Sequence, residues 1–267
     1  AFNTDGFTLG SYDESNYNGR TYVSWNWKAN GAGSANTDGT INSTVSVNQT
    51  SGFSIVSWQG TNANASVGHG LSSEPTFVFY KVRGEAGDWA VYSKHLGANK
   101  YLILNGTGSE SADAGMFQNT EPTGGKLYVG GNLANKSYPM IAYCFTPKTG
   151  YSKFGSYIGN GNADGTFVYT GFKPAFLIIK RTTSSGYDWL MYTNKINGMN
   201  VMNDYLAPNT SAAEVVDNTN QTLDFTSNGF KNRGTGGSNN ASGATYIYMA
   251  FAEAPLVGSN NVPCTAR

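Results

Sequence analysis

Two acidic–aromatic pairs are the residues of this sequence whose types and positions could most readily do chemistry. Asp88–Trp89 and Asp188–Trp189 lie 100 residues apart. A Trp ring offers a flat apolar face and an Asp carboxylate accepts hydrogen bonds from hydroxyl groups, so each pair could form a platform for a sugar. The structural alternative is that the Trp anchors the start of a strand and the Asp closes the turn before it. The candidate ligand-binding residues are these pairs and the tyrosines near them: Asp88, Trp89, Tyr92, Tyr187, Asp188 and Trp189.

No catalytic or metal-binding set accompanies these pairs in the sequence. The two histidines, His69 and His95, lie in Gly-flanked or loop contexts, without partners that would make a Ser-His-Asp triad or a metal site. Lys81 and Lys180 each follow an apolar run, where a solubility charge at a strand edge is a better interpretation than a ligand-binding cation. We therefore predict no catalytic residue, no metal and no cofactor.

The carboxylates do not form a recognisable site either. The loop 160–165 has the oxygen ligands and the Gly of half a calcium loop, but Gly171 stands where the bidentate Glu would be needed, which favours a simple turn. A glycosidase would need two carboxylates facing each other across a groove. Acidic residues such as Glu74, Glu85, Glu110, Glu121 and Glu214 are scattered in loops instead and do not recur between the repeats. A carboxylate pair formed across a subunit interface stays open as an alternative.

The elements that must position the Asp–Trp pairs are duplicated. Residues 73–92 read SEPTFVFYKVRGEAGDWAVY, and residues 172–192 read FKPAFLIIKRTTSSGYDWLMY. Each copy has a Pro entering a short apolar run, a polar turn, and a second apolar run that opens on Asp–Trp, which predicts two paired strands. A further strand, with bulky residues always in one phase, recurs at 23–27, 141–145 and 247–251. Its period of two predicts that one face lies in a core.

These repeats predict an all-β fold with two tandem antiparallel β-sandwich repeats of about 100 residues, jelly-roll-like, preceded by a partial repeat. Residues 203–217 would form one short helix at best. Because the chain starts in the middle of a repeat, we expect a longer parent protein. The predicted parts are a partial repeat at 1–32, a linker at 33–51, repeat one at 52–149, repeat two at 150–255 and a tail at 256–267.

The composition agrees with an all-β chain and excludes some classes of partner. The 267 residues include 34 Gly, 17 Tyr and 14 Phe, and only 13% are charged. The 17 basic and 17 acidic residues give no net charge and no basic block, which argues against nucleic-acid binding. The apolar runs are far too short for membrane insertion. Cys144 and Cys264 could pair only if the tail folds back.

Several motifs together resemble a repeat domain of tail-fibre-type and uncharacterised virion proteins of tailed bacteriophages, particularly marine and cyanobacterial phages. The motifs that carry this resemblance include SWNWKANG (24–31), GFSIVSWQG (52–60), TGFKPAFLIIKR (170–181) and YIYMAFAEAP (246–255). The resemblance covers nearly the whole chain. It implies a protein of the virion tail that faces the exterior, and such fibres are usually homotrimers. No catalytic motif comes with it, so no active residue is implied.

The resemblance and the aromatic, neutral β surface lead to one expected function and two alternatives. The expected function is that of a distal tail fibre or knob that attaches to the host without enzymatic activity. Its partners would be a host cell-surface glycan or an outer-membrane receptor, together with other virion proteins. One alternative is a structural role as a head fibre, capsid decoration or stalk. The other is a polysaccharide-depolymerising tailspike.

Overall fold

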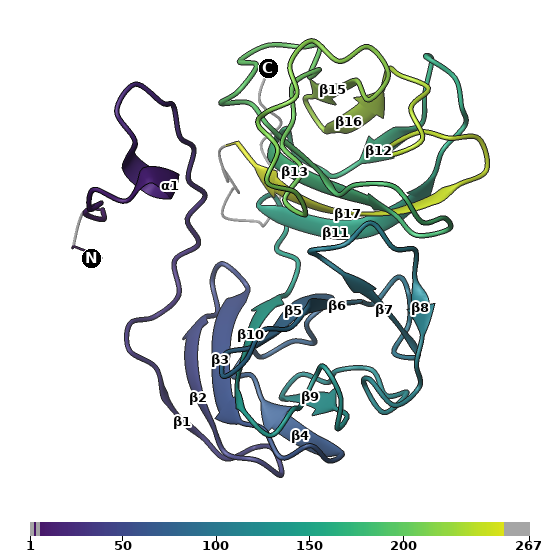
Figure 1. Ribbon diagram of the computed structural model, residues 1–267. Coiled ribbons are helices and arrows are strands. Elements are labelled where there is room, and N and C mark those ends of the chain that lie inside the picture. The colour runs from purple at the N-terminus through teal and green to yellow at the C-terminus, as the bar shows by residue number, and fades with distance from the viewer. Residues whose placement is uncertain (1–2, 4–5, 254–267) are drawn as a thin grey trace.

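The structure is a computed structural model that describes residue 3 and residues 6–253 (Figure 1). The described chain contains one short helix, α1 (Asp13–Asn16), and seventeen strands. The first ten are β1 (Ser34–Asn36), β2 (Ser43–Asn48), β3 (Phe53–Gln59), β4 (Ala65–Gly68), β5 (Phe77–Val82), β6 (Trp89–Ser93), β7 (Lys100–Ile103), β8 (Ser111–Ala112), β9 (Lys126–Val129) and β10 (Pro139–Phe145). The other seven are β11 (Ser152–Ile158), β12 (Phe167–Tyr169), β13 (Pro174–Arg181), β14 (Leu190–Thr193), β15 (Leu223–Thr226), β16 (Gly229–Asn232) and β17 (Thr245–Ala252).

The same strand order occurs in both halves of the molecule. The first main sheet runs β1-β2-β3-β10-β5-β6-β7-β8, and its inner four strands, β3-β10-β5-β6, match the second main sheet, β11-β17-β13-β14. A smaller sheet accompanies each main sheet, β4-β9 in the first half and β12-β16-β15 in the second. The pairs in these sheets are antiparallel. The prediction of an all-β, antiparallel fold is confirmed.

Alternating side chains place a hydrophobic core on each face of both main sheets. Along β5, Val78 and Tyr80 point into the core between the first main sheet and the β4-β9 sheet. Phe77 on the same strand points the other way, into a core that it shares with Phe176 of β13. The second half has its own core between its main sheet and the β12-β16-β15 sheet. The two main sheets therefore pack back to back, and β13 can carry an uninterrupted apolar run because both of its faces are buried.

The N-terminal segment differs from the prediction of a strand. Residues 20–30 form no strand in the structure, and they run as an extended arm beside both halves (Figure 1). Trp25 and Trp27 still pack against the core shared by the two main sheets. The alternating Trp25 and Trp27 thus mark a partly buried face without a hydrogen-bonded neighbour strand, because no other described segment lies in a ladder with them.

Two more segments also differ from the sequence-based expectation. Residues 33–51, expected as a linker, contribute β1 and β2 to the first main sheet, where Val45 is buried. Residues 203–217 form no helix; single bridges such as Tyr205–Val215 hold them instead. The predicted tail, 256–267, and Cys264 lie outside the described residues. Cys144 is a buried free thiol, and burial raises its pKa to about 12.

Candidate binding site

Each Asp–Trp pair is held by an Asn from a loop that follows in the chain. In the first half, the Asn105 side chain accepts a hydrogen bond from the Trp89 backbone N–H (2.8 Å) and donates one to the Asp88 carboxylate (2.9 Å). In the second half, Asn209 makes the same two bonds, to Trp189 N–H (2.9 Å) and to Asp188 (2.7 Å). The arrangement is a structural clamp that fixes the first residue of β6 and the chain just before β14.

The aromatic rings of the candidate set are mostly turned inward. Trp189 is 1% exposed, and its indole N–H donates to the Ile103 carbonyl (2.9 Å) across the two halves. Tyr92 is also 1% exposed, and its hydroxyl donates a hydrogen bond to the Glu121 carboxylate. Its pKa is raised, mainly by burial and next by this hydrogen bond. Neither Trp189 nor Tyr92 therefore presents an exposed ring face, and for Trp189 this agrees with the structural alternative given above.

The remaining candidates are more accessible. Trp89 is half-buried and stacks on Tyr143, with ring centroids 6.1 Å apart. Tyr187 is half-buried beneath the Arg181 guanidinium, 4.3 Å from the ring centroid. Asp188 is half-buried in its clamp, and Asp88 is exposed. The role of these residues in binding a ligand stays a prediction.

The two equivalent lysines are internal, so their interpretation as solubility charges at a strand edge is wrong. Lys81 and Lys180 stand on β5 and β13, which have neighbours on both sides. Lys81 Nζ donates to the Gly87 carbonyl, and Lys180 Nζ donates to the Tyr187 carbonyl (2.7 Å). Each lysine therefore ties down the turn that precedes Asp–Trp. Lys180 is fully buried, and this burial lowers its pKa to about 8.

The histidines and the Asn-rich turns also make structural hydrogen bonds. His69 is buried; its Nδ1 accepts from the Leu71 N–H (3.1 Å), and burial lowers its pKa. Asp164, in the loop with partial calcium-site spacing, forms an ion pair with Lys231 (2.5 Å), which lowers the Asp164 pKa. Within residues 6–253 no group of three or more His, Cys, Asp or Glu could hold a metal ion.

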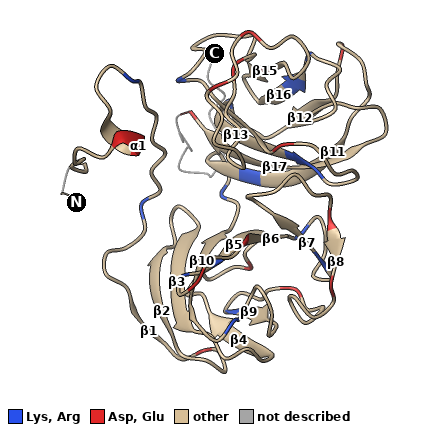
Figure 2. Ribbon diagram, viewed as in Figure 1, with Lys and Arg blue, Asp and Glu red and all other residues tan. Residues whose placement is uncertain are grey.

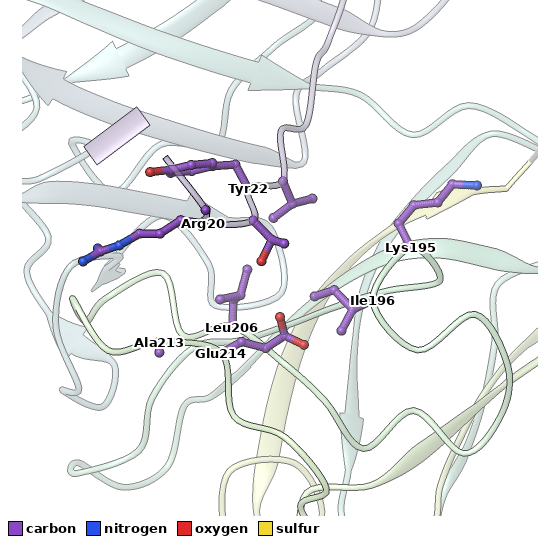
Figure 3. Close-up of a pocket in the computed structure, with 10 residues that line it drawn as sticks. Arg20, Tyr22, Lys195, Ile196, Leu206, Ala213 and Glu214 are labelled. Carbon is purple, nitrogen blue, oxygen red and sulfur yellow. The ribbon is translucent and has the colours of Figure 1, made fainter. Parts of the chain in front are cut away.

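An open cleft of about 850 Å³ lies between the N-terminal arm and loops of the second half (Figure 3). Figure 3 shows Arg20 and Tyr22 on the arm side and Leu206, Glu214, Ile196 and Lys195 on the other. The arm brings an exposed ring, a guanidinium and the Thr21 hydroxyl, and the facing loops bring the Glu214 carboxylate, while the Lys195 side chain extends away from these residues (Figure 3). An apolar ring face beside such donors and acceptors is a suitable arrangement for a polyhydroxylated ligand.

Local hydrogen bonds hold the arm side of this cleft in shape. The Tyr22 hydroxyl accepts from the Tyr17 N–H (2.8 Å) and donates to the Asp13 carbonyl (2.9 Å), which folds the chain back around α1. The Arg20 guanidinium lies over the Tyr17 ring, 4.7 Å from its centroid. Sequence reasoning missed this site, because no pattern indicates that Glu214 lies near residues separated from it by most of the chain.

The charged residues of the described part of the chain do not gather by sign (Figure 2). Basic and acidic positions are interspersed through both halves (Figure 2). No helix within the described part of the chain is long and apolar enough to span a membrane.

Comparison with known proteins gives a family but no characterised relative. No curated protein and no solved structure matches the chain. Residues 1–255 match the model of a domain family of unknown function, DUF7483, and the chain belongs to that family.

Proposed function

We propose that this protein is a virion surface protein of a tailed bacteriophage, part of a distal tail fibre or knob, that attaches to the host by binding a cell-surface glycan without chemical turnover. The motifs 170–181 and 246–255 support the phage assignment through the resemblance described above. As is usual for such fibres, three copies of the protein would form a homotrimer, which would attach to other virion proteins. The glycan site would then be present three times, so weak binding at each site would add up to avidity.

The observation that carries the binding role is the cleft between the arm and the second half. Tyr22 offers an exposed ring face whose orientation is fixed through its own hydroxyl. Glu214, from the opposite wall, supplies an acceptor for sugar hydroxyl groups. Rigid aromatic anchors cost little conformational entropy on binding, which suits a site for a neutral sugar.

A glycan array probed with the purified chain tests this role. We expect selective, saturable binding to host-envelope glycans, reduced about tenfold or more by Tyr22→Ala and by Glu214→Gln, which act from opposite walls. Tyr22→Phe, which keeps the ring, separates stacking from the hydroxyl contacts. Tyr12→Ala removes a ring that is more exposed than Tyr22 (72% against 46%) and does not line the cleft, so it should leave binding unchanged. Binding that Tyr22→Ala and Tyr12→Ala reduce equally would contradict the proposal.

A structural role as a stalk, head fibre or capsid decoration is the second candidate. The observation that favours it is the apolar core between the two main sheets, which joins the halves into one packed unit. A chain that binds no host glycan in any assembled form would support this alternative. Release of new reducing ends from host polysaccharide would instead indicate a depolymerising enzyme.

A further inference from the structure

The edge strand β11 is bare where its counterpart in the first half is covered. The neighbour strands β10 and β17 correspond, with Phe145 matching Phe251, and these residues pair with Phe53 and Ser152 respectively. Strand β3 therefore corresponds to β11. In the first half, β2 pairs along the outer edge of β3. In the second half, β11 is the terminal strand of its sheet.

The direction of the backbone groups identifies which atoms are left bare. The Tyr151 carbonyl accepts a hydrogen bond from Ala252 N–H, and Gly159 N–H donates one to the Ala244 carbonyl. The backbone N–H and C=O groups of the odd-numbered residues in this stretch therefore point toward β17. The backbone N–H and C=O groups of the even-numbered residues of β11 point away from β17, toward the open edge of the sheet. Ser152 bonds to Lys148, and the Phe154 and Ile158 carbonyls accept from His95 and Thr166 side chains. The N–H and C=O of Ser156 have no hydrogen-bond partner among the described residues.

The segment that covers β3 also closes the side of the first sandwich. Residue Ile41 bridges Val67 of β4, and the Ser43 hydroxyl donates to the Gly68 carbonyl (2.9 Å). Val45 then points into the first-half core. Residues 39–48 thus close the gap between β3 and β4 as one extended, uncharged strand of Ser, Thr, Val and Asn with few larger side chains.

In the second half the equivalent gap is a groove of about 370 Å³ between β11 and β12. Exposed apolar side chains flank it: Ile158 is 63% exposed, Phe167 45% and Tyr169 58%. Lys153 reaches across to the Tyr169 carbonyl (2.8 Å). The lining includes Lys153 and His95 but no carboxylate, so a basic segment would be repelled.

We propose that the edge of β11 and this groove accept an extended, uncharged strand rich in Ser, Thr and Val from a partner polypeptide, in the way that β3 accepts residues 39–48. The ladder would form through Ser156, as Thr44 pairs with Ser57 of β3. Alternate side chains of the incoming strand would enter the groove, as Val45 enters the first core. A backbone N–H of the partner's strand would also replace the His95 ring as the hydrogen-bond donor to the Phe154 carbonyl. This interaction is distinct from glycan binding at the arm cleft.

A synthetic peptide of residues 39–48, labelled with a fluorophore, is the probe, and fluorescence anisotropy with the full chain is the measurement. We expect saturable binding. N-methylation at Thr44, whose N–H faces β3 in the template, should weaken binding about tenfold or more. N-methylation at Val45, whose N–H faces away from β3, is the matched control and should have little effect. Both peptides test the unaltered protein.

A variant pair in the protein locates the peptide at β11. Ser156→Pro removes the outward N–H at a position where the sheet itself does not use it, and should abolish binding. Ser156→Ala keeps the N–H and should bind like the unaltered chain. Absence of saturable binding, or equal effects of the two N-methyl peptides, would overturn the proposal. Self-association of the chain that Ser156→Pro prevents would also overturn it, because a second copy would then be the occupant.

Discussion

The Asn105 and Asn209 side chains make equivalent hydrogen bonds, but those of Asn209 should contribute more to the stability of the chain. Both hold an Asp–Trp start through the same two hydrogen bonds. In the first half these bonds are exposed and water can replace them. In the second they are partly buried, and Trp189 lies in the core between the halves. A buried polar group that loses its partner carries the full cost of desolvation.

Asn209→Ala should therefore destabilise the chain more than Asn105→Ala. We expect a loss of roughly 1–3 kcal/mol in the free energy of unfolding for Asn209→Ala, because Trp189 N–H and Asp188 lose their partner together. Asn105→Ala should cost clearly less. Urea unfolding, with equal m-values required for the comparison, measures both. Equal losses would mean that the clamp does not depend on burial.

Lys180 should give the stability a specific dependence on pH. Its pKa in the folded chain, about 8, lies below its ordinary value of 10.5, because burial outweighs the opposing effect of Asp188. Between these values the unfolded chain holds more protons, so the free energy of unfolding rises with pH. Buried tyrosines such as Tyr192 have a raised pKa and lose their contribution above pH 10, which limits the useful window to about pH 8–10.

Across that window we expect the unaltered chain to gain roughly 1–2 kcal/mol. Lys180→Met, which keeps the apolar stem and removes the titrating group, should give a flatter profile. Urea titrations at several pH values measure the difference. A profile with the same slope in both proteins would show that Lys180 does not titrate in this range.

At the scale of elements, the alternation of bulky residues predicted where some strands run, but not which segments pair with them. The alternation in 141–145 and 247–251 identified β10 and β17, because a strand with a buried face repeats every second residue. The same alternation in 23–27 gave no strand, since it reports burial and not hydrogen-bond partners. Residues 43–48 lack large side chains and were expected as a linker, yet β2 pairs with β3. The arm cleft required contacts between distant segments, which local pattern does not encode.

The arm is an element held by side-chain packing instead of a ladder, so Trp27→Ala should release it. The Trp27 ring lies 5.4 Å from Phe176 and 5.3 Å from Phe251, between centroids. Few backbone bonds would remain, among them the one from the Asn48 side chain to the Lys28 carbonyl (3.0 Å). Tryptic cleavage after Lys28 should become about tenfold faster or more while the sheets stay folded. Tyr12→Ala, which removes an exposed ring outside residues 20–30, is the control; equal rates in the two variants would contradict this picture.

At the scale of the whole molecule, the back-to-back packing of the main sheets couples the two halves. Phe251 of β17 is central to the shared core, with ring centroids 6.0 Å from Phe145 of the first half and 6.1 Å from Phe176 of its own. Trp27 of the arm packs against the same ring. A repeat that shared only a linker with its neighbour would unfold independently, whereas a shared core makes unfolding cooperative.

Phe251→Ala tests this coupling, with Phe225→Ala as its match. Both remove a buried ring, at a cost of about 3–5 kcal/mol, but Phe225 lies in the separate core of the second half. The unaltered chain should show one calorimetric transition. Phe251→Ala should split it into two, because it weakens the contact between halves, while Phe225→Ala should only lower the transition temperature. Two transitions in the unaltered chain, or equal splitting in both variants, would mean that the halves are independent domains, and a stalk built from such units would bend between its repeats.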